Sequence, residues 1–68
     1  MVALVRAALR ADSSTSEFAG RLRIAVRGST VILRGEVDDL TDSDNASAVA
    51  SYVAGVEEVI DKLRVRGL

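Results

Sequence analysis

The sequence predicts an α+β fold in the chain order αββαβ, with a three-stranded sheet and two helices packed on one of its faces. Apolar residues recur at helical spacing in residues 2–11 and again in residues 46–53. In residues 20–37 and 57–67 they alternate with polar residues instead, as in half-buried strands. The chain of 68 residues contains no linker-like stretch, so a single domain over residues 1–68 is expected.

The first expected helix covers residues 2–11, VALVRAALRA, in which Ala, Leu and Arg all favour helical structure. Leu4, Val5, Ala8 and Leu9 fall on one stripe of this helix. We therefore expect these four side chains to face the core.

Two strands joined by a tight turn are expected next. Gly28 and Ser29 provide a two-residue reversal suited to a β-hairpin. One face of the two strands is aliphatic and comprises Leu22, Ile24, Val26, Val31, Leu33 and Val37. Gly35 lies on this face, where a missing side chain would let a helix cross close to the sheet or let the strand bulge.

The second helix is expected to begin with Thr41 as its N-cap, with Asp42 and Asp44 beside the free N–H groups of the first turn. Its buried stripe is predicted to consist of Ala46, Val49, Ala50 and Val53. These small residues suit close packing over Gly35. Gly55 is expected to end the helix in the left-handed C′ conformation.

The third strand is expected within residues 57–67, with Leu63 and Val65 facing the core. Asp61 interrupts the apolar alternation on that face, which indicates a bulge or an exposed strand start. A helical crossover favours a right-handed connection, so this strand should run parallel to the second. We expect it to lie beside the first strand, which gives the sheet order 2-1-3.

The composition excludes several classes of function. The chain has neither cysteine nor histidine, so disulfides, thiolate metal sites and most catalytic constellations are ruled out. The acidic stretch DDLTDSDN lacks the loop glycine and the later glutamate of a calcium-binding loop. No apolar run reaches the ~20 residues of a membrane-spanning helix, and Arg6 and Arg10 interrupt the first one, unlike in a signal peptide. We expect a non-enzymatic protein without cofactor or metal.

Charge is distributed unevenly over the predicted sheet although the net charge is only −1. Seven of the nine cations fall at outward positions of the strands, namely Arg21, Arg23, Arg27, Arg34, Lys62, Arg64 and Arg66. Such a face would attract anionic phospholipid headgroups. An open sheet face also needs polar residues for solvation alone, and Glu36 can pair with a neighbouring arginine, so both explanations remain. Nucleic acid is disfavoured because this face offers no aromatic side chain for base stacking.

The spacing of aliphatic residues and glycines forms a joint pattern over nearly the whole chain. Its parts are Ile24-x-Val26, Gly28, Val31-x-Leu33-x-Gly35-x-Val37, Ala46, Ala50, Val53-x-Gly55-Val56-x-x-Val59 and Leu63-x-Val65. In this order the pattern resembles the BON domain, a module named from bacterial osmotic-stress and nodulation proteins. The resemblance implies a phospholipid-associated binding module without catalytic residues, in which Gly28, Gly35 and Gly55 are structural.

Two functions from different classes follow. The first is peripheral association with anionic phospholipid membranes through the arginine face. The alternative is a protein–protein interaction or homo-oligomerisation module tethered to other domains, using apolar area that Val2, Val5 and Leu9 leave on the first helix. As written, the chain is expected to be cytoplasmic and, if it binds lipid, membrane-peripheral. It would be periplasmic if it is a fragment of an exported protein.

Overall fold

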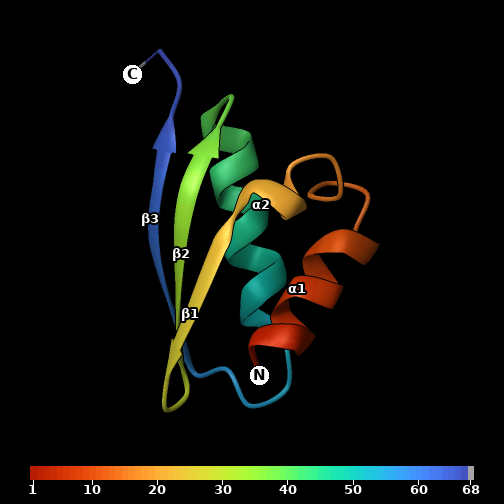
Figure 1. The fold of residues 1–68 in the computed structure, drawn as a ribbon, viewed down its shortest axis with the longest axis vertical. Coiled ribbons are helices and arrows are strands. Elements are labelled where there is room, and N and C mark those ends of the chain that lie inside the picture. Colours follow the sequence, from red (N-terminus) through yellow and green to blue (C-terminus); the bar gives the residue numbers. More distant parts are fainter. Residues whose placement is uncertain (68) are drawn as a thin grey trace.

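The computed structural model describes residues 1–67, and its helices and strands follow the predicted order. Its elements are α1 (Val2–Ala11), the short 3-10 helix η1 (Ala19–Arg21), β1 (Arg23–Arg27), β2 (Thr30–Val37), α2 (Leu40–Ser51) and β3 (Glu58–Val65). The three strands form one layer and the two α-helices form a second layer on one face of the sheet (Figure 1). The predicted α+β class is confirmed.

The strand order is β1-β2-β3, so the predicted order 2-1-3 is wrong. β2 lies in the centre, antiparallel to β1 and parallel to β3. The parallel pairing runs unbroken from Thr30–Glu58 to Val37–Val65. Strand length explains this order, because β1 has 5 residues whereas β2 and β3 have 8 each. Only β2 can pair with β3 along its whole length, and α2 then connects two neighbouring strands.

The core lies between the sheet and the helices. Its buried apolar residues are Val5, Leu9, Phe18, Ala19, Leu22, Val31, Leu33, Val37, Ala46 and Ala50. Val5 and Leu9 of α1 are fully buried, as predicted, whereas Leu4 is 59% exposed and does not belong to the core. The predicted stripe was too wide because α1 packs mainly against β1, η1 and α2, which leaves its outer side uncovered.

Gly28 and Gly35 both have positive φ angles that side chains disfavour. Gly28 occupies the first position of the hairpin turn with φ +58°, as the two-residue reversal predicts. Gly35 has φ +135°, and a Cβ atom there would lie 3.1 Å from Leu22 Cδ2 and 3.2 Å from the Arg21 carbonyl oxygen. The close approach is therefore made by the chain that leads into β1. The expected bulge is absent, since the β2–β3 pairing continues unbroken through Gly35, and the atoms nearest to Gly35 belong to Leu22 and to Arg21 of η1, not to α2.

The boundaries of α2 differ from those predicted. Asp39 is the N-cap, and its carboxylate accepts a hydrogen bond of 2.9 Å from the Asp42 N–H, so Thr41 lies inside the first turn. The helix ends at Ser51, before the predicted stop at Gly55. Gly55 has φ +92° and lies in a separate turn, closed by a 3.1 Å hydrogen bond from the Val56 N–H to the Val53 carbonyl. It permits this turn and does not cap the helix.

Polar side chains tie α2 to the sheet and α1 to the segment that leads into β1. Asp61 lies in a continuous β3 without a bulge, and its carboxylate accepts hydrogen bonds from the hydroxyls of Ser43 and Ser47 on α2. Arg6 of α1 donates to the carbonyl oxygens of Ala19 and Leu22, each at 2.8 Å. The aspartate on the inner face is thus explained by two hydroxyl donors from α2.

Candidate cationic site on the open sheet face

The sheet face opposite the helices is crossed by rows of residues that the strand register brings side by side. One row contains only cations, with Arg23 from β1, Arg34 from β2 and Lys62 from β3. Neighbouring strands are about 4.8 Å apart, so each cation has another as its direct neighbour. In the next row Glu36 lies opposite Arg64. The alternation of the three strands therefore places cations from distant parts of the chain on one surface.

A shallow hollow of about 610 Å³ lies over these two rows. We call it the cationic hollow, and its lining residues are Arg21, Arg23, Arg34, Gly35, Glu36, Lys62 and Arg64. Within residues 1–67, none of its five cations takes part in an ion pair. The hollow is therefore a concentration of uncompensated positive charge, with one carboxylate in its lining.

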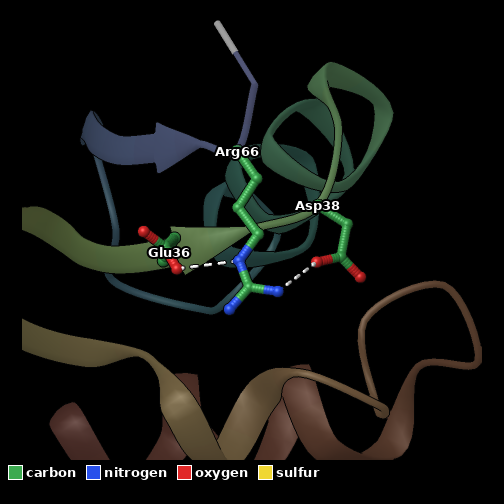
Figure 2. Close-up of polar contacts among 3 residues, drawn as sticks. All are labelled: Glu36, Asp38 and Arg66. Atoms are coloured by element: carbon green, nitrogen blue, oxygen red, sulfur yellow. Dashed lines mark hydrogen bonds and ion pairs between the residues drawn. The ribbon is translucent and has the colours of Figure 1, made fainter.

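That carboxylate is engaged by Arg66, which follows the end of β3 (Figure 2). Arg66 Nε lies 2.9 Å from Glu36 Oε1, and its Nη1 lies 3.8 Å from Asp38 Oδ1. The hydrogen bond and charge of Glu36, with a smaller effect of Asp38, raise the pKa of the Arg66 guanidinium. Arg66 is thus paired with acids and lies outside the lining of the cationic hollow.

The seven predicted site residues therefore fall into three groups. Arg21, Arg23, Arg34, Lys62 and Arg64 line the cationic hollow. Arg27 shares the same face but lies in register with Thr30 and Glu58 at the hairpin end. An apolar row of Ala25, Ile32 and Ile60 separates it from the hollow. The third group is Arg66 alone, which pairs with Glu36. The sequence indicated only that Glu36 can pair with a neighbouring arginine, and it did not identify Arg66 as the partner.

Like charges placed opposite each other in a sheet are destabilising. Replacing the central Arg34 by glutamine should therefore raise the free energy of unfolding by about 0.5–1 kcal/mol at low ionic strength. Added salt should reduce this gain, because the charges are exposed and screened. Urea unfolding at low and high salt measures the effect. Arg27→Gln is the matched control, since Arg27 has Thr30 opposite it, and no comparable gain is expected. An unchanged stability of Arg34→Gln would show that the row is not repulsive.

Within residues 1–67, no group of acidic side chains could hold a metal ion, and no helix is long and apolar enough to cross a membrane. A second hollow of about 360 Å³ lies between the helices and is lined by Ala8, Ala11, Asp12, Val49, Tyr52 and Val53. Its lining is mostly apolar and contains one carboxylate and no cation.

The sequence was compared with curated proteins and with models of protein families. No curated protein matches the sequence. A family model described as the BON domain matches residues 2–67, a span that contains every marker of the pattern from Ile24 to Val65. The BON domain is a binding-type domain and not a known enzyme family. The match covers nearly the entire sequence, and the chain therefore belongs to the BON domain family.

Proposed function

We propose that this domain is a non-enzymatic module that associates peripherally with anionic phospholipid surfaces through its open sheet face. The observation that carries the proposal is the cationic row of Arg23, Arg34 and Lys62, for which the described part of the chain provides no ion pair. Such a row is unfavourable for the isolated sheet, and a bound anion would relieve it. Membership of a family associated with phospholipid binding supports the same conclusion.

The expected strength of binding follows from the number of free cations. A basic residue close to an anionic membrane contributes about 1 kcal/mol, and this contribution falls off within a Debye length. Five cations in the hollow together with Arg27 would therefore give strong, salt-sensitive adsorption. The adjacent row of Ala25, Ile32 and Ile60 is too small to insert deeply, so electrostatic attraction dominates.

Co-sedimentation with vesicles tests this function. Vesicles of phosphatidylcholine alone serve as the neutral surface, and a series with increasing phosphatidylglycerol serves as the anionic one. We expect no binding to the neutral vesicles, binding that rises with anionic lipid content, and release by added salt. Equal binding to neutral and anionic vesicles, or no binding to either, would refute the proposal.

The alternative function, self-association or binding of a protein partner, has a separate structural basis. Val5 and Leu9 are buried and leave no apolar surface, but Val2 is 42% and Leu4 59% exposed on the outer side of α1. Leu40 is 58% exposed at the start of α2. Sedimentation velocity over a range of concentrations separates the two functions. A dimer that Leu4→Glu dissociates would favour the alternative.

A further inference from the structure

Among residues 1–67, Glu36 is the one acid that lines the cationic hollow, and its position makes it a competitor for any anionic ligand. It lies directly opposite Arg64 in the register of β2 and β3. Arg21 and Arg34 line the same hollow. A carboxylate at this position could neutralise one of these cations, yet within residues 1–67 Glu36 forms an ion pair only with Arg66.

The backbone fixes Arg66 where it can hold this carboxylate. The N–H of Arg66 donates to the carbonyl of Val37 at 2.9 Å, which extends the β2–β3 pairing by one residue. The guanidinium then reaches Glu36 Oε1 at 2.9 Å on one side and Asp38 on the other, as Figure 2 shows. Arg66 thus lies between two acids at the end of the sheet, outside the lining of the hollow.

We propose that Arg66 is a positioning residue for anion binding: it pairs with the Glu36 carboxylate in the lining of the cationic hollow and so keeps Arg64 and Arg21 free for phosphate groups. This inference rests on the proposed lipid-binding function and assigns Arg66 an indirect role within it. Without Arg66, Glu36 would pair with its cross-strand neighbour Arg64, and the hollow would lose one effective cation.

A double-mutant cycle on binding to phosphatidylglycerol-containing vesicles tests the inference. Arg66→Gln should weaken binding about fivefold, the effect of one basic residue near an anionic surface. In the Glu36→Gln background the same Arg66→Gln change should alter binding less than about twofold, because no carboxylate remains to be released. Arg66→Lys keeps the partner of Glu36 and should restore most of the wild-type affinity.

Arg27→Gln is the matched control, since it removes one charge from the same face without contacting Glu36. Its effect should be the same in the wild-type chain and in the Glu36→Gln background. The thermal midpoint of each variant, expected to change little for an exposed pair, identifies any folding defect. If Arg66→Gln weakens binding equally in both backgrounds, Arg66 contacts lipid directly and the inference is wrong. If the wild-type protein binds no anionic vesicles, the proposed function and this inference are both wrong.

Discussion

Replacing Gly35 by alanine is expected to lower the free energy of unfolding by about 2–4 kcal/mol. Two costs combine at this position. A backbone with φ +135° is strained for any residue with a side chain, and the new methyl group would lie 3.1–3.3 Å from atoms of Leu22 and from the Arg21 carbonyl. The segment that leads into β1 would have to move away from the sheet. A domain of this length has a total stability of about 3–10 kcal/mol, so a large fraction would be lost.

Gly20→Ala provides the matched control for Gly35→Ala. Gly20 lies in η1, has no positive φ, and has no atom within 4 Å of an added Cβ. Its replacement should leave stability unchanged or raise it by up to about 1 kcal/mol through a lower entropy of the unfolded chain. Urea unfolding measures both variants. Equal stabilities of the two alanine variants would contradict the close approach at Gly35.

Reversing two charges of the cationic hollow, with Arg23→Glu and Arg64→Glu in one chain, is expected to weaken binding to anionic vesicles at least about 100-fold. Both residues line the hollow but come from β1 and β3, on either side of the central strand. The double change replaces two attractive contacts with two repulsive ones. Neither side chain forms an ion pair in residues 1–67, so the fold should not depend on them.

A control for this variant should alter charge on the other layer of the molecule. Arg10→Glu, on the exposed side of α1, changes the net charge by two units without touching the sheet. Its effect on vesicle binding should be small at physiological salt, where charges beyond about 8 Å are screened. The double variant changes the net charge by four units, so a loss of binding free energy about half as large from Arg10→Glu would show that net charge, and not the open sheet face, governs the association.

Local sequence patterns predicted the two α-helices, the three strands and most of their buried faces, but not η1. The composition of residues 2–11 predicted α1 with its observed bounds, and the alternation around Leu33 and Lys62 sorted aliphatic and cationic side chains onto opposite faces. The same alternation placed four of the five cations of the hollow on one surface, whereas Arg21, expected at an outward strand position, lies in η1. These features depend only on the helical and strand periods, which any window of the sequence displays.

The strand order, the N-cap of α2 and the partner of Glu36 were not predicted, because at each of these points the sequence allows more than one arrangement. The strand order follows from the relative lengths of β1 and β3, which become known only once the strand ends are fixed. Asp39 and Thr41 are both acceptable N-caps, and the backbone geometry after β2 selects Asp39. Glu36 has several arginines within reach, and its pairing with Arg66 requires the end of β3 to be anchored on Val37.

The central position of β2 makes the charge of the open face dependent on the last strand of the chain. The hairpin alone contributes Arg23 and Arg34, whereas Lys62 and Arg64 arrive only with β3, after the α2 crossover. Any local opening that detaches β3 from β2 would remove two cations from the surface while the hairpin stays formed. Such an opening would also free Glu36 from Arg66, so the positive field of this face depends on β3 staying paired with β2.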